Sequence, residues 1–370
     1  MSATIRVASF ISLMLVSMQS WAEYQLNMRP GVTSFSQGAY GIHTMVMWIC
    51  VGIGIIVFGA MIYSIIMHRK SRGAVAAKFD DNLTVELLWT IIPFIILAFM
   101  AVPATRVLLA MEDTSNSDMS IKITGYQWKW HYDYLAEDIS FFSNLATPVE
   151  QTQNKATKDN NYLLEVDNPV VVPVNTKVRL LLTSNDVIHS WWMPAFAVKK
   201  DAIPGFINES WFETDKVGTY RGQCAELCGK NHGFMPIVVK VVSADDYQAW
   251  VAGKKQLAAA AAESATKTWT RDELIEHGKT VYATNCAACH QVSGEGIPNV
   301  FPALKGSAIA TGPAAKHIDI VTHGKTGTAM QAFGTQLNDA DLAAVITYER
   351  NAWGNNMGDV VQPADIKAAR

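Results

Sequence analysis

The sequence predicts a multidomain membrane protein with an N-terminal two-helix transmembrane hairpin, a Greek-key β-barrel and a C-terminal all-α domain. Three observations support this division. Two long uncharged apolar segments lie within the first 110 residues, short β-branched runs fill the middle of the chain, and helical periodicity begins near residue 270. With 49% apolar residues the chain can fill several cores. A net charge of −3 without a basic run argues against nucleic-acid binding.

Residues 1–22 have the features of a secretory signal peptide that is cleaved after Ala22. Arg6 precedes a short apolar stretch from Val7 to Met18, and Ser20-Trp21-Ala22 supplies a small-x-small cleavage site. About a dozen apolar residues are too few to span the ~30 Å hydrocarbon core of a bilayer. An additional membrane helix is the alternative interpretation.

Residues 23–110 are predicted to form the transmembrane hairpin, with helices at about 45–67 and 87–109. As a helix, the first uncharged run rises about 34 Å, enough to cross a membrane. The short loop between the runs contains Arg69, Lys70 and Arg72, and the positive-inside rule places it in the cytoplasm. The chain is therefore expected in a bacterial inner membrane, with everything after residue 110 in the periplasm. A buried hairpin of a soluble protein is the alternative.

Residues 111–252 are predicted to form the β domain. They carry 12 basic and 18 acidic side chains, an excess that would attract a basic partner. Short alternating or β-branched runs separated by turn residues suggest a Greek-key sandwich or barrel, with strands expected at 121–124, 126–134, 170–174, 178–183 and 237–242.

An alanine-rich linker, helical or flexible, is expected at 253–268, followed by an all-α domain at 269–357 and a tail at 358–370. Thr270 and Glu273 have the spacing of a capping box at the start of the first helix of this domain. A second helix is predicted at about 339–350.

The β domain contains a compact set of soft metal ligands. Cys224, Cys228, His232 and Met235 lie within twelve residues, and a thioether beside thiol and imidazole groups favours copper over zinc. Two cysteines suggest two coppers bridged by both sulfurs, with His189 supplying a second imidazole from another loop. A Cys224–Cys228 disulfide is the alternative in an oxidising compartment.

The all-α domain contains Cys286-Ala-Ala-Cys289-His290, the spacing of a covalent haem c attachment site in which the histidine binds iron. A redox dithiol shares the Cys-x-x-Cys part of this motif. A methionine as sixth ligand suits an electron carrier, and Met330 in a glycine-rich loop is the predicted ligand, with Met357 as the alternative. His277, His317 and His323 are predicted to be surface residues.

These motifs resemble subunit II of cytochrome c oxidase fused to a methionine-ligated cytochrome c. The resemblance rests on the 224–235 cluster and on the segments Asp186-Val-Ile-His-Ser-Trp, Gly125-Tyr-Gln-Trp-Lys-Trp and Val85-Glu-Leu-Leu-Trp. It implies a cupredoxin-like barrel with a dinuclear copper centre (CuA). Its ligands would be His189, Cys224, the Glu226 carbonyl, Cys228, His232 and Met235.

The same resemblance assigns roles to further residues. The Glu226 carboxylate is expected to hold a Mg ion at the junction with subunit I. Trp128 is expected to be the residue through which electrons enter, and Glu86 the carboxylate at the mouth of a proton channel. Gln127, Asp133 and Asp186 match positions of a docking face for a donor cytochrome.

The resulting expectation is subunit II of a proton-translocating bacterial cytochrome c oxidase. Electrons would pass from a donor cytochrome through one covalent haem c and CuA to subunit I, where O₂ is reduced. Partners would be subunits I and III, the donor and membrane lipid. The alternatives are the electron-input subunit of a CuA-containing nitric oxide reductase and a metal-free, membrane-tethered binding module.

Overall fold

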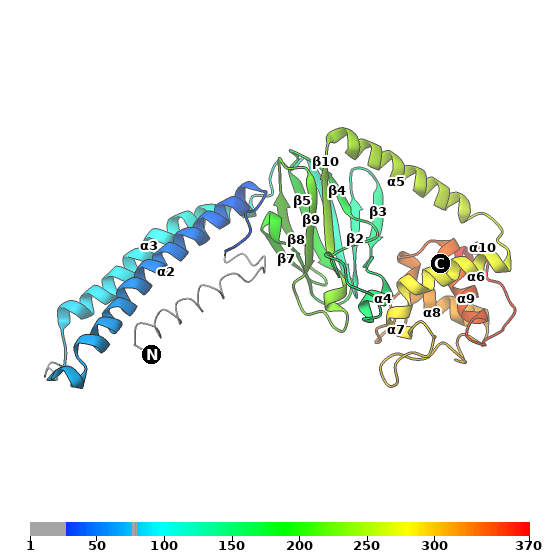
Figure 1. Cartoon of the computed structure of the whole chain (residues 1–370). Helices are drawn as coiled ribbons and strands as arrows, with labels where there is room; N and C mark the ends of the chain where they lie inside the picture. Colours follow the sequence, from blue (N-terminus) through cyan, green and yellow to red (C-terminus); the bar gives the residue numbers. More distant parts are fainter. Residues whose placement is uncertain (1–26, 76–77, 79) are drawn as a thin grey trace.

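The computed structural model describes residues 27–75, 78 and 80–370, so the predicted signal peptide at 1–22 lies outside the described residues. Two long helices occupy one end of the molecule, two β-sheets the middle and a group of shorter helices the other end (Figure 1). The predicted three-part fold class is confirmed.

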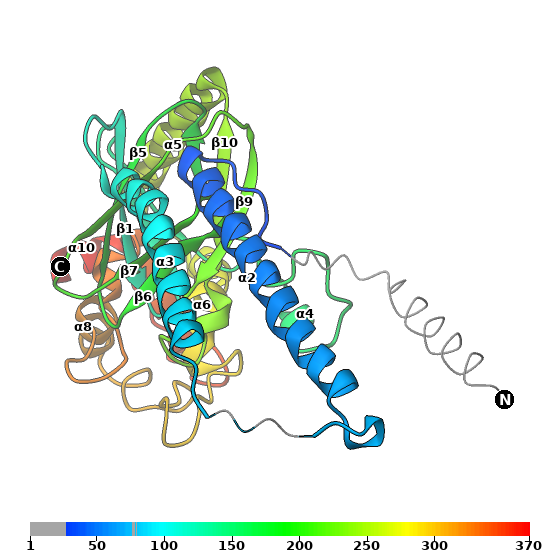
Figure 2. The same ribbon diagram turned by 90° about the vertical axis from the view of Figure 1, so that its left-hand side faces the viewer.

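The hairpin consists of α2 (Ser34–Met67) and α3 (Leu83–Glu112), which run side by side from the β domain (Figure 2). Both helices are long and apolar enough to cross a membrane, and their apolar side chains are largely exposed. A capping box at Thr33 starts α2 well before the apolar run. The loop between them contains the short 3₁₀ helix η1 (Lys70–Arg72).

The start of α2 and the end of α3 are fixed to the β domain. The Thr33 hydroxyl donates to the Phe196 carbonyl (3.0 Å), and the Trp211 indole donates to the Ala110 carbonyl near the end of α3 (3.2 Å). Phe35 packs edge-on against the Trp211 ring. The membrane helices and the sheets therefore share a hydrogen-bonded junction.

The β domain is a pair of five-stranded sheets. One has the order β3-β2-β1-β5-β8 and the other β4-β10-β9-β6-β7, with parallel pairs at β1–β5 and β4–β10. Their inward side chains form one core. The strands are β1 (Met119–Tyr126), β2 (Lys129–Tyr134), β3 (Ile139–Ser143), β4 (Val170–Pro173), β5 (Val178–Ser184), β6 (His189–Met193), β7 (Val198–Ala202), β8 (Asn208–Phe212), β9 (Gly218–Cys224) and β10 (Ile237–Val242).

The structure divides the segment that the sequence pattern predicts as one strand at 126–134. Gln127 and Trp128 form a turn, and β1 and β2 pair antiparallel on either side of it. Three short helices lie in the loops of this domain: α4 (Val149–Thr152), η2 (Pro194–Phe196) and η3 (His232–Phe234).

Helix α5 (Ala244–Ser264) connects the two domains, so most of the segment expected to be a linker is helical. Its first turns belong to the β domain, because Tyr247 and Val251 are buried in that core. Its second half is exposed and leads to the C-terminal helices (Figure 1).

The C-terminal domain packs around the crossing of α6 (Arg271–Asn285) and α9 (Asp339–Asn351). The predicted capping box of Thr270 and Glu273 is confirmed. Residues 358–370, expected to be a tail, include a helix whose Ile366 is fully buried. The remaining elements are α7 (Ala287–His290), α8 (Ala314–His323), η4 (Phe333–Thr335) and α10 (Pro363–Ala369).

The α6–α9 crossing depends on Gly278, because a Cβ at this position would overlap the Ala344 carbonyl of α9. We expect Gly278→Ala to destabilise the C-terminal domain by about 2 kcal/mol through overpacking. The measurement is denaturant unfolding followed by a signal from this domain. Gly253→Ala in α5 is the matched control, because a Cβ there meets nothing within 4 Å and alanine favours the helix by about 1 kcal/mol. Equal stability of the two variants would contradict the prediction.

Candidate metal centres

The first centre lies where β9 runs into the loop before β10. Cys224 ends β9, and Cys228, His232 and Met235 follow in the loop. The Cys228 sulfur lies 3.5 Å from Nδ1 of His232 and 3.5 Å from the sulfur of Met235. A thiol, an imidazole and a thioether thus meet at one point.

His189 joins this cluster from the neighbouring strand β6. The pairing of β6 with β9 sets Trp191 opposite Cys224 and brings Nδ1 of His189 to 4.0 Å from the Cys224 sulfur. The ligand atoms of His189, Cys224 and Cys228 lie within 4.8 Å of one another, and all three residues are buried. The Glu226 carbonyl is 3.4 Å from the Cys224 sulfur.

The two cysteine sulfurs are 3.9 Å apart, about twice the length of a disulfide bond, and both thiols are free. A hydrogen bond from the Cys228 thiol lowers the pKa of Cys224 well below its ordinary value, and Nδ1 of His189 adds to the effect. A buried pair that readily yields a thiolate suits a soft metal ion. The donor set therefore fits copper.

Asp186 orients His189. Its Oδ1 lies 2.9 Å from Nε2 of His189, which leaves Nδ1 facing the sulfurs. The other carboxylate oxygen accepts a hydrogen bond from the Gln127 backbone N–H (2.7 Å). A partner of this kind on the outer nitrogen of a ligand histidine fixes its tautomer and orientation.

The β1–β2 turn covers the ligand loop. The Trp128 indole and the Gln127 side-chain amide both donate to the Cys228 carbonyl, at 3.1 and 3.0 Å. The structure thus brings Gln127, Trp128 and Asp186 together around the copper ligands. Asp133 lies further along β2, beside His131 and Lys122.

Two other predicted site residues lie apart from the cluster core. The Glu226 side chain is exposed and precedes Leu227, whose side chain is 79% exposed. Glu86 is exposed in the first turn of α3, at the end of the membrane helix farthest from the β domain.

The second centre lies between α6 and the loop that follows α7. Cys286 follows α6, Cys289 and His290 lie in α7, and Nδ1 of His290 contacts the Pro302 carbonyl at 2.8 Å. Because that contact occupies Nδ1, the tautomer leaves Nε2 available to bind a metal. The two thiols beside this histidine fit a covalently attached haem.

Met330 lies in a loop that closes on itself, where the Lys325 N–H donates to the Met330 carbonyl (3.0 Å). Gly324 begins this loop with a φ of +73°, and a Cβ there would come within 2.7 Å of the Met330 carbonyl. Met330 and Cys286 both pack against the helical core, whereas Met357 is 38% exposed.

The prediction that His317 is a surface residue is wrong. His317 is 1% exposed, and its Nε2 lies 2.8 Å from the carboxylate of the equally buried Glu349. His317 occupies the inner face of α8 together with Ile318 and Val321, a helical stripe that the sequence already contains.

The sequence interpretation also missed two residues that lie between the domains. Lys129 begins β2 and is 7% exposed, with its amine 3.2 Å from the Asn285 side-chain oxygen. Gln331 follows Met330 and donates from its amide to the Gln127 carbonyl and to Asp186. Their amino-acid types carry no signal for such contacts, because the contacts arise only when the domains meet.

Comparisons with known proteins identify the family. Residues 119–242 and 21–107 match the family models described as the periplasmic and the transmembrane domain of cytochrome c oxidase subunit II. A probable cytochrome c oxidase subunit 2 of Rickettsia bellii is 40% identical over 258 residues, which cover 68% of this chain and 94% of that protein. The chain belongs to the cytochrome c oxidase subunit II family.

A second relative agrees with this assignment. Subunit 2 of Cereibacter sphaeroides is 37% identical over 60% of this chain and 80% of its own length. The solved periplasmic domain of subunit II from Bradyrhizobium japonicum is 44% identical and covers 39% of this chain and 97% of its own, with a TM-score of 0.35. Residues 273–348 match the model described as cbb3-type cytochrome c oxidase subunit III.

This chain is therefore a component of an oxidoreductase complex. It combines a transmembrane part and a copper-binding cupredoxin domain with a cytochrome c domain. Two centres of soft and imidazole ligands, one in the β domain and one in the C-terminal domain, support a role in electron transfer.

The room around His189 depends on Gly125, because a Cβ there would lie 2.7 Å from Cδ2 of the imidazole. We expect Gly125→Ala to displace the ring and weaken copper binding by about tenfold or more, although residue 125 is not a ligand. Copper content and the visible spectrum of the full chain in detergent measure this. Gly233→Ala is the matched control: it adjoins His232, yet a Cβ there meets nothing within 4 Å. Unchanged copper binding in both variants would show that Gly125 does not control the position of His189 for copper binding.

Proposed function

We propose that this chain is the electron-input subunit of a proton-translocating bacterial cytochrome c oxidase. In this role the cytochrome c domain accepts electrons from a donor cytochrome and passes them to the cupredoxin domain, which delivers them to subunit I for reduction of O₂ to water. The convergence of His189, Cys224, Cys228, His232 and Met235 from two segments into one largely buried cluster carries the proposal.

The residues have the following proposed roles. Copper and haem, when bound, supply one-electron redox chemistry. The two thiolates, two imidazoles, the thioether and the Glu226 carbonyl hold a dinuclear CuA centre. Cys286 and Cys289 attach one haem c, and His290 and Met330 bind its iron. If the same ligands stay in place in both oxidation states of the metal, little rearrangement accompanies electron transfer.

Trp128 is proposed as the residue through which electrons reach the copper centre. Its indole donates to the carbonyl of the ligand Cys228, so a covalent and hydrogen-bonded path joins the ring to the cluster. The exposed carboxylate of Glu226 beside exposed Leu227 is proposed to hold a Mg ion at the junction with subunit I.

The proposed orientation places both metal domains in the periplasm and the basic loop near η1 in the cytoplasm. The positive-inside rule supports it, because Arg69, Lys70 and Arg72 lie between α2 and α3. A signal peptide at 1–22, the donor cytochrome, subunit III and bound lipid belong to the same proposal.

Metal analysis of the full chain, produced with haem maturation and extracted in detergent, tests the proposal. We expect about two coppers per iron and a near-infrared band of mixed-valence copper. His189→Ala should remove most of the copper and leave the iron unchanged, because the haem site is on another domain. His323→Ala is the control, since His323 is exposed on α8. Iron without copper in the wild-type chain would refute the proposed electron path.

Glu86 is proposed to receive protons at the cytoplasmic end of α3. In the assembled oxidase we expect Glu86→Gln to slow proton-coupled turnover roughly tenfold, because the amide cannot exchange a proton. Glu112→Gln, at the opposite end of the same helix, is the matched control. Equal proton uptake in wild type and the Glu86 variant would rule out this role.

A further inference from the structure

The cupredoxin and cytochrome c domains contact each other through few polar groups. Among the described residues, the hydrogen bonds between residues 119–242 and 269–370 come from two side chains. The Gln331 amide donates to the Gln127 carbonyl at 3.3 Å and to Asp186 at 3.0 Å. Lys129 donates to Asn285 at 3.2 Å.

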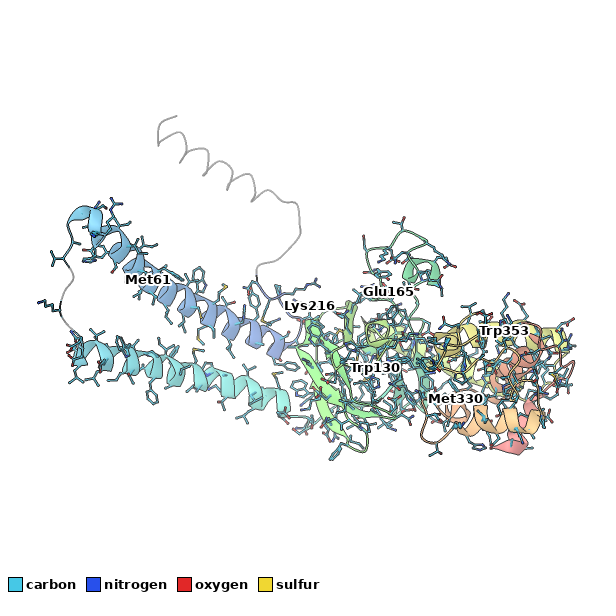
Figure 3. All side chains as sticks on the ribbon, turned by 90° about the horizontal axis from the view of Figure 1, so that it is seen from below. Met61, Trp130, Glu165, Lys216, Met330 and Trp353 are labelled. Atoms are coloured by element: carbon cyan, nitrogen blue, oxygen red, sulfur yellow. The ribbon has the colours of Figure 1, made fainter. Side chains whose placement is uncertain are left out.

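Gln331 is held in the orientation that these bonds require. The side-chain amide of Gln336 donates to the Gln331 side-chain oxygen at 3.0 Å, which leaves the Gln331 nitrogen directed at the other domain. Gln331 directly follows Met330, and Figure 3 shows Met330 on the side of the cytochrome c domain that faces Trp130 and the sheets. The contact therefore ties the Met330 loop to the copper domain.

The acceptor of this bond leads directly to a proposed copper ligand. Asp186 accepts from Gln331 through one carboxylate oxygen and contacts Nε2 of His189 through the other. Two hydrogen bonds and one carboxylate thus join the loop of Met330 to the imidazole of His189. The Gln127 carbonyl, the second acceptor, belongs to the turn that also carries Trp128.

Lys129 is buried where the cupredoxin and cytochrome c domains meet. Its amine lies 4.4 Å from the Phe142 ring of its own domain and 5.5 Å from the Phe333 ring of the cytochrome c domain. No carboxylate forms an ion pair with Lys129 in the described part of the chain. Burial lowers the pKa of its amine to about 8. Closing the interface over this amine opposes docking, so other contacts must hold the domains together.

We propose that Gln331 is the positioning residue that docks the cytochrome c domain on the cupredoxin domain, with the Met330 loop against Asp186 and the Trp128 turn. This role rests on the proposed electron path between the two centres. The covalent connection through α5 raises the effective concentration of the two surfaces to the order of millimolar, so a few hydrogen bonds suffice. The partner of the Gln127–Trp128–Asp186 face is then this chain's own cytochrome c domain.

Acylation of lysine amines, read by mass spectrometry, tests the docking on the full chain in detergent. Lys129 reports on the interface, and Lys199, exposed on β7, is the internal reference. The variants are Gln331→Ala, which removes the amide; Gln331→Glu, which sets a carboxylate against Asp186; and Gln331→Lys, which offers Asp186 a cation. Gln248, exposed on α5, receives the same three substitutions as the matched control.

We expect Gln331→Ala to raise Lys129 labelling at least about fivefold relative to Lys199, because the loss of one net hydrogen bond gives roughly that factor and the amide makes two. Gln331→Glu should raise it further because of like-charge repulsion. Gln331→Lys should keep Lys129 protected at low salt and lose that protection as salt screens the new ion pair. The Gln248 variants should label like the wild type.

A second readout covers the case in which Lys129 is shielded within its own domain. In the metal-loaded chain, the oxidised haem should speed the magnetic relaxation of the copper signal when the domains are docked, and Gln331→Glu should weaken that effect. A change in either readout that is confined to the Gln331 variants supports the proposal. Unchanged labelling together with unchanged relaxation overturns it.

The labelling separates this proposal from the electron path itself. Labelling requires no copper, so it tests docking by Gln331 independently of the metal content of the chain. Correct metal stoichiometry with unchanged labelling and unchanged relaxation in every Gln331 variant would overturn the docking role and leave the electron path standing. If the chain binds no copper but Lys129 is protected in a way that depends on Gln331, the docking role stands and the proposed electron path is refuted.

Discussion

The antiparallel pairing of β6 with β9 is the contact on which the copper cluster depends. It consists of two residue pairs, Trp191 with Cys224 and Trp192 with Gln223, and it sets His189 beside the cysteine loop. Gly222 makes the approach possible, because a Cβ there would overlap the Trp192 carbonyl. The Ala225 N–H continues the pairing by donating to the Ser190 carbonyl (3.0 Å). A short stretch of backbone thus determines the distance between a strand ligand and a loop ligand.

The sequence predicted the elements whose signals are local. The apolar runs of α2 and α3, the Thr270 capping box and the Cys286–His290 motif all depend on residues close in sequence or on composition. Strands β6 and β9 were not predicted, although each carries a proposed ligand. Trp192 is exposed and β9 alternates weakly, so neither strand has a clear period of two.

The prediction for His317 failed for a different reason. A histidine in an amphipathic helix fits either face, and the deciding partner, Glu349, lies on α9, 32 residues away. The contacts of Lys129 and Gln331 depend on residues 156 and 145 or more positions away. Residue type and spacing carry no information about such partners, since tertiary contact alone creates them.

The cytochrome c domain buries a network of ionisable side chains that includes His317, Glu349 and Arg350. Arg350 is 1% exposed and bonds Asp359 and the carbonyls of Ala310 and Gly312, which ties α9 to two loops. With the His317–Glu349 pair, this network fastens the helices around a small apolar core. Such pairs add little net stability, but loss of one partner would leave a buried charge. Substitution of one partner would therefore destabilise the domain more than the intact pair stabilises it.

Helix α5 fixes the direction in which the chain leaves the β domain for the cytochrome c domain. Its start is fixed because Tyr247 and Val251 are embedded in the β-sheet core, and its helical hydrogen bonds continue to Ser264. Each residue added or removed along its exposed half would turn the departing chain by about 100° and move it about 1.5 Å. The length of this alanine-rich segment therefore determines both the distance between the domains and their relative rotation about the helix axis. Relatives that keep the same docked face should vary here in steps of whole helical turns.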